Sequence, residues 1–168
     1  MRIYIIGYMA SGKSNLGRAL ANRLGFDFVD LDFLFEERFR ISVLDFFAKY
    51  DESAFRRIER TLLHETLERD NLVISTGGGT PCFFDNMDVI EKAGLSVYLK
   101  MDAATLVARL GSVRRKRPLL KDIPPSGLPD KVQKQLAARE PFYARASLVV
   151  DGAAVSMDDL ADRVRSML

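Results

Sequence analysis

The sequence has little of several features, and each shortage excludes a class of protein. One cysteine, Cys82, cannot form a disulfide within the chain, and one histidine, His64, cannot supply an ordinary zinc site of histidines and cysteines. No run approaches the roughly 18 apolar residues that a membrane-spanning helix needs, and the N-terminus lacks the pattern of a signal peptide. These absences predict a soluble protein of a reducing compartment, the cytoplasm, with no membrane partner.

Charge of one sign is not in excess either. The chain has 25 lysines and arginines against 23 aspartates and glutamates, a net charge of +2, so no broad basic field predicts a nucleic-acid partner. Its 168 residues suit one domain, 1–168, and 48% hydrophobic with 29% charged residues is typical of a globular chain. Nothing in the sequence demands an oligomer, so we expect a monomer.

Short apolar runs alternate with stretches of helical periodicity along the chain. The expected strands are 3–6, 26–29, 72–74, 95–99 and 148–150. The expected helices are 13–24, 33–39, 43–48, one from about 53, 85–93, 103–110, 130 to about 144, and one after Ser156. This alternation predicts the α/β class, with a five-stranded parallel sheet covered by helices on both faces.

The first strand is followed by a phosphate-binding loop. GYMASGKS, from Gly7 to Ser14, matches GxxxxGK[ST] without a gap and opens the next helix. The glycines let successive backbone N–H groups face the phosphates, Lys13 reaches the β and γ phosphates, and Ser14 ligates Mg²⁺. The expected ATP-binding residues here are Gly7, Met9, Ala10, Ser11, Gly12, Lys13, Ser14 and Asn15. No NKxD guanine-reading motif is present, which favours ATP over GTP.

Two aspartates follow the second expected strand. Asp30 and Asp32 are two residues apart, so both side chains are expected to point to the same face of the strand or of the bend beyond it. One carboxylate in the water shell of magnesium and another on an acceptor hydroxyl would suit phosphoryl transfer to an alcohol. Two solvated turn aspartates remain the alternative.

Arginines and glycines mark further candidate positions. FRRIE places Arg56 and Arg57 on a helix whose apolar face leaves one arginine near the cleft and the other outward, although a surface pair is equally compatible. Gly77, Gly78 and Gly79 follow the third strand, and three glycines there favour close approach of the backbone to a ligand at the carboxyl edge of the sheet.

Residues 111–129 contain four prolines and follow no periodic pattern, so we expect a long mobile loop. The basic run Arg114–Arg117 within it could be a nucleic-acid patch, but the balanced charge of the remaining chain argues against that. A basic loop that closes over ATP and excludes water is the better reading. Arg117, followed by proline, is the residue we expect to meet the transferring phosphoryl.

With these residues in view, the chain resembles the shikimate kinase family over essentially its whole length. The segments GYMASGKS, FVDLD, FRRIE, STGGG, KRPLL and AREPFY occur in the family's order. The resemblance implies transfer of the γ-phosphoryl of ATP to the 3-hydroxyl of shikimate, the fifth step of chorismate and aromatic amino acid biosynthesis. It also implies a nucleoside-monophosphate-kinase-like fold with substrate-binding helices at about 33–60 and a mobile lid at about 111–124.

The resemblance implies roles on the acceptor side. Asp32 would bind the shikimate hydroxyls and act as base, while Arg56 and Arg139 would hold the carboxylate. The glycines at 77–79 would contact the acceptor through their backbone. Glu59, one helical turn after Arg56, would orient that arginine by a salt bridge.

On the nucleotide side, the resemblance implies that Lys13 and Arg117 stabilise the transferred phosphoryl and that Arg109 stacks on adenine. Ser14 would ligate Mg²⁺ and Asp30 would join its shell through water. ATP is then the co-substrate and magnesium the cofactor.

Two residues depart from the usual pattern of the family. Asn15 stands where threonine is common and Ala10 where glycine is common, so we expect altered nucleotide affinity at most. A related kinase of another small acceptor, gluconate or a nucleoside monophosphate, is the competing enzyme reading. A regulatory module that holds ATP without transferring phosphate is the competing hypothesis from another class. It predicts loss of a chemical residue, but the chain has all four, Lys13, Ser14, Asp32 and Arg117.

Overall fold

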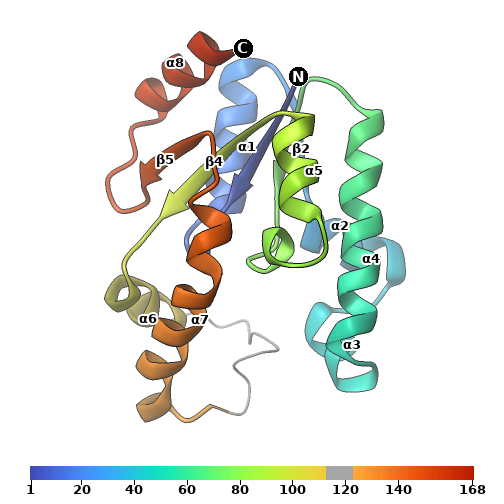
Figure 1. The fold of residues 1–168 in the computed structure, drawn as a ribbon, viewed down its shortest axis with the longest axis vertical. Helices are drawn as coiled ribbons and strands as arrows, with labels where there is room; N and C mark the ends of the chain where they lie inside the picture. The colour runs from blue at the N-terminus through green and yellow to red at the C-terminus, as the bar shows by residue number, and fades with distance from the viewer. Residues whose placement is uncertain (113–122) are drawn as a thin grey trace.

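A computed structural model describes residues 1–112 and 123–168, and its centre is a sheet of five parallel strands (Figure 1). The strands are β1 (Arg2–Ile6), β2 (Asp27–Asp30), β3 (Leu72–Ser75), β4 (Leu95–Lys100) and β5 (Leu148–Asp151). Their order in the sheet is β2-β3-β1-β4-β5, and every pairing is parallel. In the register, Ile3 lies between Val73 and Leu95. The predicted α/β class and five-stranded parallel sheet are confirmed.

Helices connect the strands. The α-helices are α1 (Lys13–Leu24), α2 (Leu31–Phe39), α3 (Val43–Lys49), α4 (Glu52–Glu65), α5 (Asn86–Ala93), α6 (Ala103–Ser112), α7 (Leu128–Tyr143) and α8 (Met157–Met167). Short 3-10 turns are η1 (Thr66–Glu68), η2 (Thr80–Cys82) and η4 (Pro125–Gly127). Within the described parts of the chain, no helix is both long enough and apolar enough to cross a bilayer.

Alternate residues of the strands enter two separate cores. Ile3 and Ile5 of β1 pack with α1 and α8, whereas Tyr4 and Ile6 belong to the larger core beneath α2–α7. All four side chains are fully buried, because a parallel strand with helices on both faces has no wet side. The two-sided burial explains why this strand is an unbroken apolar run.

The carboxyl ends of the strands form the working edge of the sheet. After β1 the chain crosses to β2 at one edge of the sheet, and after β4 it crosses to β5 at the other edge. The neighbouring strands β1 and β4 therefore flank a topological switch point. At this edge α6 and α7 lie on one side and α2, α3 and α4 on the other (Figure 1). Ligands of open α/β sheets bind at such a point.

The second half of the chain departs from the expected boundaries. The α6 helix continues two residues past 110 to Ser112, and α7 begins at Leu128 rather than 130, capped by Gly127 without a side-chain bond. The expected loop 111–129 is therefore helical at both ends. Residues 113–122, with Arg114–Arg117 and most of the expected lid at 111–124, lie outside the described residues.

Gly94 offers a test of how closely the elements pack. A Cβ built on it would overlap the carbonyl oxygen of Arg2, a backbone atom whose position no side-chain rotation can change. Gly94→Ala is therefore expected to lower the free energy of unfolding by about 3 kcal/mol. Gly111→Ala, on an exposed helical site with nothing within 4 Å, should instead raise it by about 0.5–1 kcal/mol. Urea unfolding measures both, and equal midpoints for the two variants would refute this packing.

Candidate active site

The phosphate loop occupies the turn between β1 and α1, as predicted. Gly7 and Gly12 adopt positive φ angles of 148° and 96°, which glycine tolerates best. A Cβ on Gly7 would lie 2.8 Å from the Leu99 carbonyl oxygen, so the loop also lies against the end of β4. Ala10 has a φ of 64°, a left-handed conformation that costs a non-glycine residue about 1–2 kcal/mol. A glycine at this position would adopt the same conformation without that cost.

Lys13 is buried inside this loop. Its Nζ donates to the Tyr8 carbonyl oxygen at 2.9 Å, which holds the ammonium across the turn of the loop. Ser11 is also buried, and its hydroxyl has no hydrogen-bond partner in the structure. Asn15 lies exposed on the first turn of α1, beside Ser14. A glycine-rich loop that opens a helix offers backbone N–H groups suited to a polyphosphate.

Ser14 and Asp30 form the oxygen cluster expected for magnesium. The Ser14 hydroxyl donates to an oxygen of Asp30. The Ser75 hydroxyl oxygen lies 3.3 Å from the Ser14 hydroxyl oxygen. Among the described residues there is no group of three His, Cys, Asp or Glu side chains that could hold a metal ion. Hard oxygen ligands of this kind fit Mg²⁺, which keeps several waters and takes other ligands from phosphates.

Contrary to the expectation from the sequence spacing, Asp30 and Asp32 do not lie together on one face of a strand or bend. β2 ends at Asp30, whose carboxylate accepts from Phe33 N at 3.1 Å and caps α2, so Asp32 lies in the first helical turn. The two carboxylates therefore belong to different elements. Asp32 still reaches the acceptor side: its Oδ1 lies 3.1 Å from the Cβ position of Gly77. The Asp30 carboxylate accepts hydrogen bonds from Phe33 N and from the Ser14 hydroxyl, whereas the Asp32 carboxylate lies beside Gly77.

Arg56 is held in a buried clamp on α4. It is 5% exposed, and its Nη1 donates to Glu59 at 2.9 Å while Nε donates to Glu52 at 3.2 Å. The predicted Glu59 salt bridge is confirmed. Burial lowers the pKa of Arg56, but the two carboxylates outweigh it, so the pKa lies above its ordinary value. Arg57 is exposed, which confirms that the two arginines face different ways.

The glycines at 77–79 bring both halves of the site together. A Cβ on Gly77 would lie 2.9 Å from Glu59 Oε2, and one on Gly79 would lie 2.6 Å from Arg56 Nη2. Gly78 faces the other way: its Cβ would lie 3.1 Å from the backbone nitrogen of Met9 and 3.2 Å from Nη1 of Arg139. No larger residue fits at Gly77 or Gly79 without displacing these groups. The glycines therefore lie close to side chains of the protein, and their approach to a ligand stays a prediction.

Arg139 has a buried nitrogen without a hydrogen-bond partner. The residue is 6% exposed, and among residues 1–112 and 123–168 nothing accepts a hydrogen bond from its buried Nη1. Its Cζ lies 5.7 Å from the ring centroid of Tyr8. A buried guanidinium N–H without an acceptor is costly unless a ligand supplies one. The fork geometry of arginine suits a carboxylate or a phosphate.

Tyrosines and a cysteine line this side of the site. The Tyr143 hydroxyl donates to the Gly78 carbonyl oxygen, and the Tyr8 hydroxyl donates to Gln135. Burial raises the pKa of Tyr143 and raises that of Tyr8 to about 12, so both hydroxyls stay protonated and donate. Burial also raises the pKa of Cys82 to about 11, which leaves a neutral thiol and agrees with a packing role.

Of the two arginines expected to contact the nucleotide, Arg109 and Arg117, the structure describes only Arg109. Arg109, at the end of α6, donates from Nη1 to the carbonyl oxygens of Ala10 and Ser11, each at 3.4 Å, so it lies beside the phosphate loop. Its stacking on adenine stays a prediction. Arg117 lies outside the described residues, and its role at the transferred phosphoryl stays a prediction as well.

The sequence reasoning missed several residues that support the site. They are Tyr8, Glu52, Ser75, Thr80, Phe83 and Tyr143. Glu52 had a signal, because it lies four residues before Arg56 on one helix face. The other residues contact the site from separate elements. No spacing in the sequence predicts contacts such as the hydrogen bond of Tyr143 to Gly78.

Comparison with known proteins agrees with this geometry. A family model described as shikimate kinase matches residues 9–168. The shikimate kinase of Azobacteroides pseudotrichonymphae is 42% identical over 164 residues, which cover 97% of this chain and 96% of the relative.

Solved structures agree with the family model. The crystal structure of the Bacteroides thetaiotaomicron shikimate kinase superposes with a TM-score of 0.89 at 37% identity, covering 99% of this chain and 97% of that one. The Acinetobacter baumannii enzyme in complex with shikimate has a TM-score of 0.88 at 30% identity, covering 99% and 91%.

A five-stranded parallel sheet with a phosphate loop at its switch point, and an arginine-lined site beside that loop, defines a phosphate-loop kinase of a small molecule. The chain belongs to the shikimate kinase family. It is therefore a kinase, a transferase that binds a nucleotide, and the resemblance stated from its motifs is confirmed.

Proposed function

We propose that the chain transfers the γ-phosphoryl of ATP to the 3-hydroxyl of shikimate, the fifth step of chorismate and aromatic amino acid biosynthesis. The observation that supports this most is the buried, unpartnered Nη1 of Arg139, which lies 3.2 Å from the Cβ position of Gly78. The same position is 3.1 Å from the Met9 nitrogen of the phosphate loop. A carboxylate bound at Arg139 would therefore place an acceptor within reach of the γ-phosphate.

On the acceptor side, Arg139 and Arg56 bind the carboxylate of shikimate, and the backbone at 77–79 forms the floor of the site. Arg56 is already held by two glutamates, so Arg139 supplies most of the new hydrogen bonding. Asp32 accepts a hydrogen bond from the acceptor hydroxyl, orients it toward the γ-phosphate and removes its proton. Positioning and charge stabilisation dominate such a transfer.

On the nucleotide side, the loop residues Gly7 to Asn15 hold the phosphates through backbone N–H groups and Lys13. Ser14 would ligate Mg²⁺ and Asp30 would contact it through water, an arrangement supported by their hydrogen-bonded oxygens beside the loop. A bound Mg²⁺ would supply positive charge to the β and γ phosphates. Arg109 stacks on adenine, and Arg117 joins Lys13 at the transferred phosphoryl.

We also propose that residues 1–168 act as one monomeric kinase domain in the cytoplasm, with ATP and shikimate as partners. The substrate-binding helices at about 33–60 correspond to α2, α3 and the first part of α4. A nucleic-acid or membrane partner is not part of this proposal, since the balanced net charge of +2 offers no attraction to a polyanion.

Coupled release of ADP tests the function. Purified protein with Mg²⁺ and ATP is supplied in parallel with shikimate, gluconate, nucleoside monophosphates or no acceptor. We expect turnover with shikimate alone. Turnover with another acceptor would keep the kinase and overturn the assignment of Arg56 and Arg139 to a shikimate carboxylate. Tight ATP binding without turnover on any acceptor would indicate a regulatory nucleotide-binding module.

A further inference from the structure

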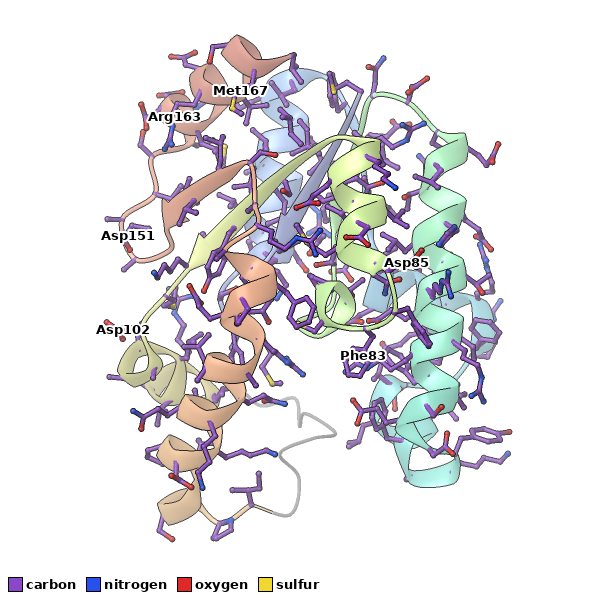
Figure 2. The ribbon with its side chains drawn as sticks, in the orientation of Figure 1. Phe83, Asp85, Asp102, Asp151, Arg163 and Met167 are labelled. Atoms are coloured by element: carbon purple, nitrogen blue, oxygen red, sulfur yellow. The ribbon has the colours of Figure 1, made fainter. Side chains whose placement is uncertain are left out.

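Arg56 is held by an aromatic ring as well as by its two glutamates. The Phe83 ring centroid lies 4.2 Å from Arg56 Cζ, and the Phe55 centroid lies 5.4 Å away. Figure 2 shows Phe83 between the η2 turn and α4. The guanidinium thus contacts carboxylates at its nitrogens and an aromatic side chain at short distance.

The short segment that carries Phe83 is itself fixed. Cys82 N donates to the Gly79 carbonyl at 2.9 Å, and Asn86 Nδ2 donates to the Thr80 carbonyl at 2.9 Å. The Thr80 hydroxyl donates to Glu59 at 2.8 Å, which joins the segment to the clamp of Arg56. Phe83 therefore belongs to the same continuous unit as the glycines that form the floor of the site.

We propose that Phe83 is a positioning residue for substrate binding: its ring holds the guanidinium of Arg56 in the orientation that receives the acceptor carboxylate. The glutamates accept hydrogen bonds from all three nitrogens of Arg56 at the edges of the planar group, and the ring packs against that group as a further constraint on its orientation. A guanidinium over an aromatic face is attracted by the ring as well as packed against it. This inference rests on the proposed function, because it assigns Arg56 a carboxylate to bind.

The next turn of α4 supplies a matched control. Arg60 Cζ lies 5.3 Å from the ring centroid of Phe84, and Arg60 forms an ion pair with Asp85 at 3.0 Å. This pair repeats the arrangement of Phe83 and Arg56 at the surface, where Phe84 is 54% exposed. The proposal gives it no part in the reaction.

The experiment compares Phe83→Leu and Phe83→Met with Phe83→Tyr and with the control Phe84→Leu in steady-state assays. Loss of the aromatic face should raise the KM for shikimate about tenfold, because the contact of a buried guanidinium with a half-buried ring has about that magnitude. The KM for ATP should stay within a factor of two, which also reports that the variants fold. Phe83→Tyr should restore the KM for shikimate, and Phe84→Leu should behave as the unaltered chain.

An unchanged KM for shikimate in Phe83→Leu and Phe83→Met would overturn the inference while leaving the function intact. Equal rises in both KM values, or no rescue by Phe83→Tyr, would assign Phe83 a merely structural role and overturn it too. Absence of shikimate turnover in the unaltered chain would overturn the proposed function, and the inference with it. The two failures are therefore distinguishable.

Discussion

Asp32→Asn lowers the turnover number with shikimate by about 10²–10⁴-fold and leaves ATP binding unchanged. The amide keeps the size of the carboxylate but cannot take the proton of the acceptor hydroxyl. Asp32 Oδ1 lies 3.1 Å from the Cβ position of Gly77, on the acceptor side, whereas Lys13 and Ser14 belong to the phosphate loop. The change therefore affects the chemical step and not the nucleotide site. Steady-state kinetics with calorimetric titration of ATP measures both quantities.

Asp27→Asn is the control for this variant. Asp27 begins β2 and pairs with Arg69 on the surface at 3.2 Å, so its loss should leave the kinetics unchanged. Near-normal turnover in Asp32→Asn would remove Asp32 from the mechanism. A parallel loss of ATP affinity would instead indicate that the residue supports the phosphate loop.

Arg139→Ala raises the KM for shikimate by about 100-fold or more, with a much smaller effect on the KM for ATP. The reason is the buried Nη1, which has no partner within the described structure and lies beside Gly78. A desolvated, charge-assisted contact to a carboxylate is worth about 2–5 kcal/mol when one partner is removed. Initial rates with each substrate varied in turn measure the two constants.

Two further variants make this result specific. Arg139→Lys keeps the positive charge but lacks the planar guanidinium that can donate two parallel hydrogen bonds to a carboxylate. This variant should therefore recover only part of the affinity for shikimate. Lys134→Ala removes an exposed cation of the same helix and should change neither constant. Equal effects of Arg139→Ala on both substrates would contradict a carboxylate role for this arginine.

The parts of the site that the sequence predicts are those encoded by consecutive residues. The phosphate loop is one such part, because eight neighbouring residues specify its turn and its helix start. The salt bridge of Arg56 with Glu59 is another, since helical spacing alone brings the two side chains together. The alternation of strands and helices likewise predicts the sheet and its crossovers.

The position of Asp32 shows where this reasoning fails. A spacing of two residues suggests a strand face, but Asp30 caps a helix by accepting from Phe33 N. An aspartate three residues before that amide is also the signature of a helix start, so the same letters support two structures. In this chain Asp30 forms the helix cap, and the Asp32 carboxylate lies in the first turn of α2.

Individual side-chain contacts between distant segments could not be predicted from any local pattern. Tyr8 meets Gln135 across 127 residues of chain, and Tyr143 meets Gly78 across 65. Phe83, which follows the η2 turn, contacts Arg56 on α4. No local sequence pattern distinguishes Phe83 from its exposed neighbour Phe84. Such pairings depend on how the elements pack, which one sequence does not specify.

Phosphorus NMR of the reaction mixture tests the central claim most directly. The protein, Mg²⁺, ATP and shikimate are incubated together, and the site of phosphorylation is read from the coupling of the new phosphomonoester to a ring proton. The account predicts one new phosphomonoester, on the 3-hydroxyl, formed in step with ADP. A phosphoryl group on another hydroxyl, or ADP formed with free phosphate alone, would contradict it.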